Sequence, residues 1–116
     1  MSQGDDETTL GELKRSVAAF NEARDWGQFH TPKDLAMAVS IEANELLELF
    51  LWRDAEAPVD EARLREELGD VCITLLNLAN VTGVDLSEAL RDKLALNDAR
   101  YPVALSRGKA LKYDEL

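Results

Sequence analysis

The alternation of apolar and polar positions predicts four helices, with the prolines at 32, 58 and 102 lying between or just after them. The first helix begins near Thr9, whose spacing to Glu12 is that of a capping box, and ends between residues 24 and 27. The second begins at Thr31-Pro32, an N-cap threonine followed by proline at the first helical position, and extends to about Arg53.

Two further helices follow the loop that contains Pro58. Asp60 is placed to cap a helix that extends to about residue 82, where Gly83 ends it. Asp85 is placed to cap the last helix, which Tyr101-Pro102 ends. No run of β-branched or aromatic residues alternates with polar ones, so the fold class is all-α.

The second and third helices are apolar on more than one side, as in helices that are buried all round. A single small four-helix bundle cannot cover every such face, so chains are expected to associate through these helices. The apolar residues in question are Met37, Ile41, Leu47, Phe50, Leu51, Cys72, Ile73, Leu75, Leu76 and Val81.

Four carboxylates lie on faces where leucine would be ordinary. At about 100° per residue, Glu42 and Glu45 share the core stripe of the second helix. Glu67 and Asp70 lie on the edge of the stripe formed by Leu64, Leu68, Val71 and Leu75. Antiparallel helices joined by a loop of about six residues would bring all four acids together, and burying them without cations is costly.

Charge and length narrow the possible functions. The chain has 116 residues and a net charge of −10, and residues 42–70 carry −7 of it, from ten acidic and three basic side chains. This argues against polymeric nucleic acid as a partner, and the charged residues interrupt the chain too often for a membrane span. We expect one domain over residues 1–116, with a core at about 9–102, a polar N-terminus and a basic C-terminal tail.

A single cysteine, Cys72, allows no intrachain disulfide, and the acidic N-terminus lacks the features of a secretory signal. We therefore expect a cytoplasmic protein. An all-oxygen ligand set favours Mg²⁺, with Mn²⁺ as a possible substitute, and protein-bound Mg²⁺ commonly recruits substrate phosphates. The four acids therefore point to phosphoryl chemistry.

The ordered motifs resemble the MazG-like, all-α nucleoside triphosphate pyrophosphohydrolases. The paired acids resemble the family signature, and other motifs over about residues 13–113 resemble its dCTP pyrophosphatase branch. The segments are Glu42-Ala43-Asn44-Glu45, Glu67-Leu68-Gly69-Asp70, Phe20 to Asp25, Trp26, Phe29-His30-x-Pro32, Glu48-Leu49-Phe50-x-Trp52, Lys93-x-x-x-Asn97 and Arg100-Tyr101-Pro102.

The resemblance implies Mg²⁺-dependent hydrolysis of a (deoxy)nucleoside triphosphate, dCTP or a related or modified pyrimidine nucleotide, to the monophosphate and pyrophosphate. The metal ligands would be Glu42, Glu45, Glu67 and Asp70. The resemblance also implies assembly as a dimer or a dimer of dimers, which agrees with the association expected from the apolar faces. We expect a carboxylate to deprotonate the attacking water, with Glu45 and Glu48 as the two candidates. The spacing does not choose between them.

Further residues are candidates for substrate binding. By resemblance, Trp26, Trp52 and His30 border the nucleobase. Lys93, Asn97 and Arg100 form one polar stripe on the fourth helix that is suited to a triphosphate or to solvent. At Thr74, vertebrate members of the branch have tyrosine, so base or sugar contacts there are expected to differ.

Two non-catalytic interpretations compete with the enzyme. The acids of a helical interaction module would bind a basic partner, with an affinity that falls as salt rises. An oxygen-ligand metal-binding module would hold a cation without hydrolysing anything, but it would leave the two tryptophans and His30 without a role.

Overall fold

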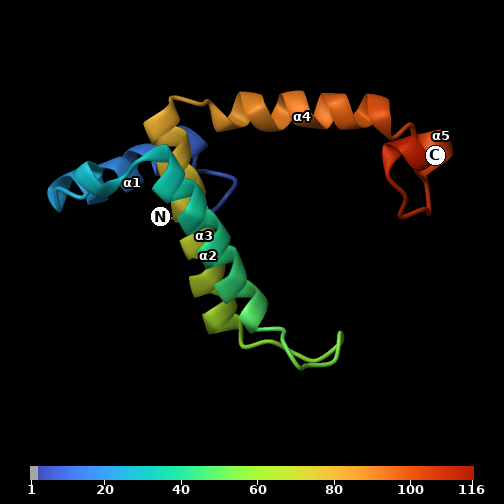
Figure 1. Cartoon of the computed structure of the whole chain (residues 1–116), viewed down its shortest axis with the longest axis horizontal. Coiled ribbons are helices and arrows are strands. Elements are labelled where there is room, and N and C mark those ends of the chain that lie inside the picture. The colour runs from blue at the N-terminus through green and yellow to red at the C-terminus, as the bar shows by residue number, and fades with distance from the viewer. Residues whose placement is uncertain (1–2) are drawn as a thin grey trace. The chain divides into compact units, whose positions relative to one another are not determined.

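The computed structural model describes residues 3–116, which form helices and loops with no β-strand among them (Figure 1). The chain divides into two compact units, one ending at Gly83 and the other beginning at Val84. Within residues 3–116, none of the helices combines the length and apolarity of a membrane span. The prediction of an all-α fold is confirmed, whereas the single domain and the oligomer stay predictions.

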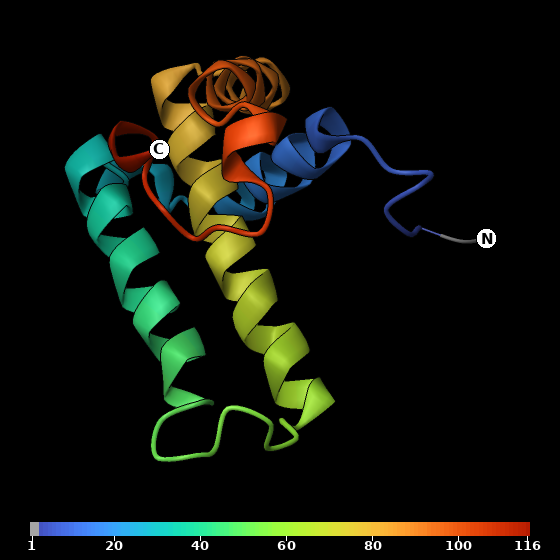
Figure 2. The same ribbon diagram turned by 90° about the vertical axis from the view of Figure 1, so that its right-hand side faces the viewer.

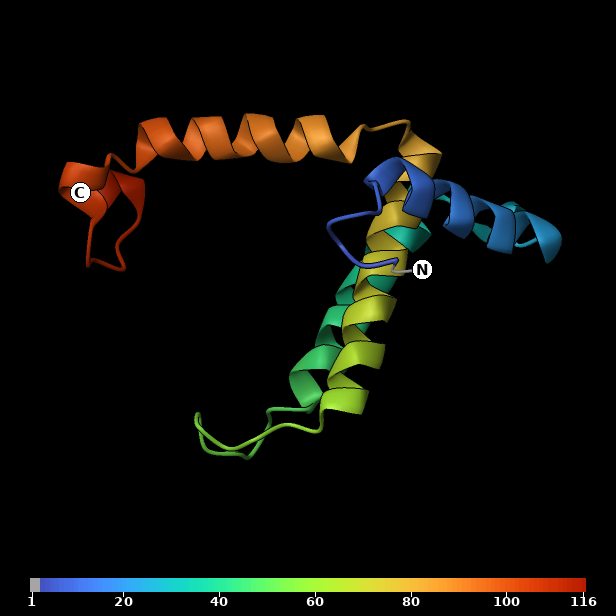
Figure 3. The same ribbon diagram turned by 180° about the vertical axis from the view of Figure 1, so that it is seen from behind.

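The first unit contains three α-helices and a short 3₁₀ turn. α1 covers Leu10–Ala23, η1 covers Gly27–Phe29, α2 covers Pro32–Glu48 and α3 covers Glu61–Thr82. α2 and α3 pack along each other as an antiparallel pair (Figure 2). α1 crosses the C-terminal half of α3, as Figure 3 shows from behind. α3 is therefore the element on which both other helices of this unit pack.

The predicted helix starts of this unit are confirmed by capping hydrogen bonds. Glu12 N donates to Thr9 Oγ1 at 3.1 Å, and Asp34 N donates to Thr31 Oγ1 at 3.1 Å. At α3, the cap is Asp60, whose carboxylate accepts from the backbone of Ala62. Each cap gives a partner to a backbone N–H that the first helical turn would otherwise leave unsatisfied.

The predicted end of the second helix is wrong. α2 ends at Glu48, five residues before Arg53, and the connection to α3 is twice the predicted six residues, covering 49–60. Phe50 N donates to Leu47 O in a tighter turn, and Trp52 then adopts a left-handed backbone with φ of 60°. Arg53 Nη2 donates to Pro58 O at 2.6 Å and closes this loop on itself.

The second unit begins after Gly83, whose φ of 71° ends α3 as predicted. It contains α4, Leu86–Arg100, capped by Asp85 as predicted, then α5, Val103–Ser106, and a terminal 3₁₀ turn, η2, Tyr113–Glu115. The Arg100 guanidinium lies over the Tyr113 ring, 4.7 Å from its centroid. This contact ties the C-terminal segment to the end of α4.

Three leucines and one alanine form the buried apolar core, but several apolar side chains of α2 and α3 remain exposed. The core residues are Leu35, Leu49, Leu76 and Ala79. Met37 and Ile41 on α2 and Ile73 on α3 are each about half exposed. The exposed apolar faces agree with the hydrophobic pattern from which association was predicted.

Candidate functional site

Four carboxylates from α2 and α3 meet between the two helices. Each of Glu42, Glu45, Glu67 and Asp70 contributes an oxygen, and these oxygens all lie within 4.8 Å of one another. Two turns of different helices supply them, because Glu42 and Glu45 are three apart on α2 and Glu67 and Asp70 are three apart on α3. The predicted convergence of the two acidic pairs is therefore present.

The group has an inner and an outer half. Glu42 and Glu67 are half-buried, whereas Glu45 and Asp70 are exposed. The sequence placed Leu68 on the buried stripe of α3 and Glu67 at its edge, and this prediction is wrong. Leu68 is 50% exposed, whereas Glu67 is half-buried. One acid of each pair thus lies where an apolar side chain would normally pack.

The two inner carboxylates each have an oxygen without a partner. Glu42 Oε2 and Glu67 Oε2 are fully enclosed and make no hydrogen bond within residues 3–116. Buried polar atoms of this kind are rare and costly unless a ligand or ion satisfies them. Oxygen ligands from four carboxylates can satisfy a hard divalent cation, so the residues present fit a bound metal ion.

Electrostatics at the group also favour a cation. Burial raises the pKa of Glu42, as do a side-chain hydrogen bond with Glu45 and the charges of Glu45, Asp70 and Glu67. Burial also raises the pKa of Glu67, as do the charges of Glu45, Asp70 and Glu66, although Arg63 opposes the increase. Because like charges and burial both disfavour the ionised forms, the carboxylates gain by binding a positive ion.

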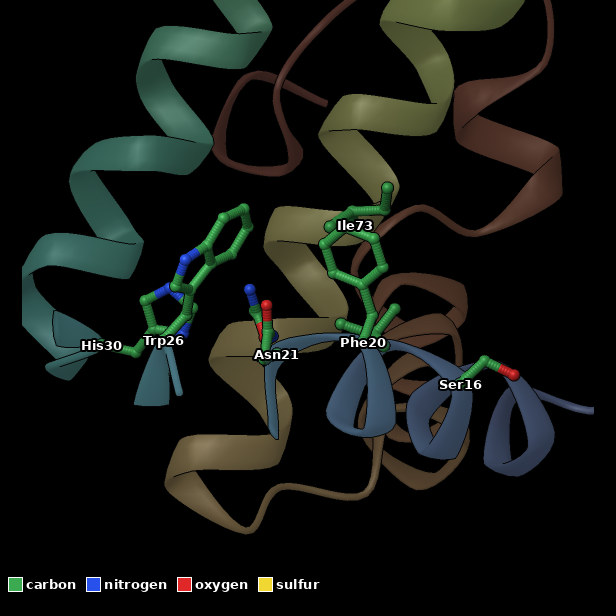
Figure 4. Close-up of a pocket in the computed structure, with 8 residues that line it drawn as sticks. Ser16, Phe20, Asn21, Trp26, His30 and Ile73 are labelled. Atoms are coloured by element: carbon green, nitrogen blue, oxygen red, sulfur yellow. The ribbon is translucent and has the colours of Figure 1, made fainter. Parts of the chain in front are cut away.

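A cavity of about 320 Å³ lies farther along α3, where α1 crosses it. Its lining on α3 begins at Ile73, three residues or about one turn after Asp70, and extends to Asn77, seven residues after Asp70. Figure 4 shows Trp26 and His30 on one side of the Asn21 amide and Phe20 and Ile73 on the other. The lining residues are Ser16, Val17, Phe20, Asn21, Trp26, His30, Ile73 and Asn77.

Aromatic contacts fix one wall of this cavity. The Phe20 and Trp26 rings meet edge to face with their centroids 5.7 Å apart. The Arg24 guanidinium lies 3.7 Å from the centroid of the Phe20 ring, which adds a cation–π contact. The Trp26 side chain is 43% exposed, so part of the wall is open to solvent. Such a cavity suits a flat aromatic ligand.

A comparison with known proteins identifies the family. The model described as the MazG-like family matches residues 37–116. The chain belongs to the MazG-like family. It is 47% identical over 117 residues to dCTP pyrophosphatase 1 of Rattus norvegicus and 44% identical to that of Homo sapiens, each match covering 95% of this chain and 69% of the relative.

Two other comparisons agree with this assignment. Over 41 residues, 35% of this MazG-like chain and 39% of the relative, it is 51% identical to a dATP/dGTP diphosphohydrolase of Cyanophage S-2L. The crystal structure of a pyrophosphatase from Archaeoglobus fulgidus is similar with a TM-score of 0.73 and 36% identity, covering 80% of this chain and 92% of that one. The similarity thus includes the fold as well as the sequence.

The structure brings some of the predicted substrate residues of this MazG-like chain together. Trp26 and His30 line the same cavity. Thr74 lies on α3 next to Ile73 of the cavity lining, and its hydroxyl donates to Val71 O at 2.8 Å. Glu48 is the last residue of α2 and lies outside the group of four carboxylates that includes Glu45.

Other predicted residues lie elsewhere. Trp52 is fully exposed in the connection after α2, whereas His30 lies just before the first residue of that helix. The 17 residues of α2 separate the two ends by about 25 Å, so Trp52 does not border the cavity of its own chain. Lys93, Asn97 and Arg100 lie on α4 in the second unit, where Lys93 and Arg100 are exposed and Asn97 is half-buried.

Sequence reasoning missed one pair of residues in the cavity. Asn21 and Asn77 are each only 8% exposed, and Asn21 Nδ2 donates to Asn77 Oδ1 at 2.5 Å. Asn77 lies on the same stripe of α3 as Asp70, but no sequence pattern indicates that it faces an asparagine of α1. An asparagine inside an amphipathic helix could have indicated such a contact, because asparagine lowers helix propensity and no local role explains its presence.

Proposed function

We propose that this chain hydrolyses a (deoxy)nucleoside triphosphate, dCTP or a related or modified pyrimidine nucleotide, to the monophosphate and pyrophosphate with Mg²⁺. The observation that carries the proposal is the convergence of four carboxylates from α2 and α3, two of which have enclosed oxygens without a partner. α3 also lines the aromatic cavity. The names of the relatives and their identity over 95% of the chain support it.

Glu42, Glu45, Glu67 and Asp70 would hold the Mg²⁺, and Mn²⁺ offers the same preference for oxygen ligands. Bound there, the metal would neutralise phosphate charge and polarise phosphate oxygens. The cavity would hold the base against the wall formed by Trp26 and Phe20, with His30 at its edge. About 10 Å of α3 separates Asp70 from Asn77, a length that leaves space for the sugar between base and phosphates.

Glu45 is our candidate for the general base that takes a proton from the attacking water. It belongs to the exposed half of the group, so a water molecule can reach its carboxylate while the inner acids stay enclosed. Glu48, the other candidate, lies about one helical turn farther along α2, at the end of the helix, and would act by positioning. The hydrolysis would break the phosphoanhydride between the α- and β-phosphates, since the monophosphate and pyrophosphate are the proposed products.

The remaining predicted residues act in this proposal as substrate contacts made outside the cavity. Trp52 would meet a nucleotide held by another chain of a homo-oligomer, since it lies about 25 Å from its own cavity along α2. Lys93, Asn97 and Arg100 would contact the triphosphate, and Thr74 the sugar or base. The exposed apolar faces of α2 and α3 support a dimer or a dimer of dimers.

We also propose a cytoplasmic location, where an unpaired and exposed Cys72 would stay reduced. No polymeric nucleic acid and no membrane is required as a partner. The single domain over residues 1–116, with its core at about 9–102, is the unit that would carry this activity.

The test is a screen of common and modified deoxynucleoside triphosphates that resolves monophosphate plus pyrophosphate from diphosphate plus phosphate. We expect Mg²⁺-dependent pyrophosphate release, greatest with a pyrimidine substrate. Release of phosphate alone would show that a different bond is cleaved. Absence of turnover together with salt-sensitive binding of a basic partner would support an interaction module instead.

A further inference from the structure

The side chains of Asn21 and Asn77 form a neutral polar pair at the cavity wall. Both residues are more than nine-tenths buried, and both line the cavity of about 320 Å³ together with Phe20, Trp26 and Ile73. The pair joins α1 to α3 through the 2.5 Å bond from Asn21 Nδ2 to Asn77 Oδ1. Asn80 makes a second link of the same kind, because its Nδ2 donates to Lys14 O at 3.0 Å. It does not line this cavity, although it lines a second cavity of about 310 Å³ together with Asn21 and Asn77.

The two side-chain amides have hydrogen-bonding groups that the pair does not use. The bond occupies one hydrogen of Asn21 and the carbonyl of Asn77. Within residues 3–116, the Asn21 Oδ1 acceptor and the Asn77 Nδ2 donor make no further hydrogen bond, and neither is among the fully enclosed unpartnered atoms. One acceptor and one donor are therefore unused by the chain, on two residues that line both the mostly apolar aromatic cavity and the second cavity beside it.

The polarity of the pair can be inverted. If both amides rotate by half a turn, Asn77 Nδ2 donates to Asn21 Oδ1, and the unused groups become the Asn77 carbonyl and the Asn21 amide. Either arrangement leaves one donor and one acceptor, so the pair matches an edge of either order. No described side chain other than these two makes a hydrogen bond that would fix one arrangement.

We propose that the Asn21–Asn77 pair reads the edge of the nucleobase, through one donor and one acceptor at adjacent positions of the ring. This deepens the proposed function and rests on it in taking the occupant to be a base. In a pyrimidine these positions are N3 and the 4-substituent. In a 4-amino pyrimidine N3 accepts and the amino group donates, whereas in a 4-oxo pyrimidine N3–H donates and the oxo group accepts. Because the pair can invert, it binds 4-amino and 4-oxo pyrimidines alike and rejects a ring whose N3 is blocked.

The experiment measures nucleoside binding to the full chain by NMR, following the side-chain amide signals of Asn21 and Asn77, without triphosphate or metal. We expect deoxycytidine and thymidine to shift both signals with affinities within about tenfold of each other. N3-methylthymidine should bind at least about tenfold more weakly than thymidine, since one bidentate amide contact gives discrimination of this order. Equal affinity for N3-methylthymidine and thymidine would overturn the proposal.

The double substitution Asn21→Leu with Asn77→Leu removes both partners of the buried bond at nearly constant volume, which avoids leaving one polar group unpaired. This variant should lose the difference between thymidine and N3-methylthymidine. The matched control, Asn80→Ala, also removes an amide link between α1 and α3 and should keep that difference. Retained discrimination in the double variant would contradict a role in base reading.

The assay separates this proposal from the proposed hydrolysis. Nucleoside-induced shifts without pyrophosphate release from any triphosphate would leave base reading intact and contradict the enzyme. Pyrophosphate release without any shift of the two asparagine signals would do the reverse. The comparison within the unmodified chain requires no variant to fold.

Discussion

Two polar clusters on α3 are buried in opposite ways. At the carboxylate group, Glu42 Oε2 and Glu67 Oε2 are enclosed without partners, and their neighbours repel them. Asn77, seven residues beyond Asp70, also lies in a helix interface, but the Asn21 amide donates a hydrogen bond to the side-chain carbonyl of Asn77. The first cluster has enclosed oxygens that a cation would satisfy, whereas the second is partly satisfied by its own hydrogen bond and still has hydrogen-bonding groups to offer.

This difference assigns the two clusters different tasks. Buried groups without a partner in the chain are common at functional sites. They destabilise the ligand-free protein, and the bound ligand supplies the missing partner. A satisfied neutral pair can instead position a ligand at little cost in stability. We therefore expect changes at the carboxylates to affect turnover and metal binding, and changes around the asparagines to affect substrate affinity.

The largest effect is expected from Glu45→Gln and Asp70→Asn. Each removes one negative ligand oxygen while keeping the shape of the side chain, and we expect kcat to fall by at least about 100-fold, since even outer partners of metal ligands cost about 10–100-fold. Pyrophosphate release at saturating Mg²⁺ measures the loss. Glu66→Gln is the matched control, because Glu66 is an exposed acid beside Glu67 on α3 but lies outside the group.

The control variant should retain activity within a few-fold of the original chain. If Glu45→Gln and Asp70→Asn both kept normal turnover, the carboxylate group would not be the catalytic centre. The distinction between the two clusters would then lose its functional meaning.

A smaller effect is expected at the aromatic wall. Trp26→Leu removes a ring that meets Phe20 edge to face in the cavity, and stacking on a base contributes about 1–3 kcal/mol. We expect KM to rise about tenfold with little change in kcat or in the stabilisation by Mg²⁺. Phe29→Leu is the control, because Phe29 lies in the same 3₁₀ turn region, is 64% exposed and does not line the cavity.

If Trp26→Leu lowered kcat and left KM unchanged, the cavity would contribute to the chemical step and the division of tasks would fail. Steady-state kinetics with one pyrimidine triphosphate at fixed Mg²⁺ distinguishes the two results.

The charge at the carboxylates should also set the stability of the metal-free chain. The pKa of Glu42 and that of Glu67 are raised in the folded chain above the ordinary value of 4.5. The stability gained from binding those protons is present below about pH 4.5 and is lost as pH rises through the raised pKa values. Metal-free chain should therefore lose stability at this site between mildly acidic and neutral pH.

Glu67→Gln tests this expectation, because the amide carries no charge and cannot serve equally well as a metal ligand. At neutral pH without metal, its Tm should be higher than that of the original chain. With Mg²⁺ at about 100 times its Kd, the original chain should gain about 2.7 kcal/mol and the variant much less. Thermal unfolding at two pH values, with and without Mg²⁺, measures both quantities. A lower Tm for metal-free Glu67→Gln would contradict the inferred repulsion.

The sequence predicted the features that depend on local chemistry. The caps at Thr9, Thr31, Asp60 and Asp85 and the helix end at Gly83 involve groups within a few residues of each other, so spacing alone identifies them. The convergence of the carboxylates was also predictable, because two three-residue spacings on antiparallel neighbours leave few other arrangements.

Features that depend on contacts between distant segments were not predictable in this way. The early end of α2 depends on the turn at Phe50 and the loop closed by Arg53, and the exposure of Leu68 depends on how α3 rotates against α2. The Asn21–Asn77 bond joins residues 56 apart in sequence, and no local pattern selects that partner.

The smallest effect is expected from Asn80→Ala. Its amide donates to Lys14 O in a half-buried position, so the substitution removes one hydrogen bond between α1 and α3 and should lower the free energy of unfolding by about 1 kcal/mol. Denaturant unfolding measures this change, and kcat and KM should both stay near their original values because Asn80 lies outside the aromatic cavity and the carboxylate group. A rise in KM comparable to that of Trp26→Leu would mean that any loosening of α1 on α3 disturbs the substrate site. The asparagine pair would then affect the substrate only by holding α1 against α3. The carboxylates would keep their role in metal binding, but the asparagines would have no direct contact with the base.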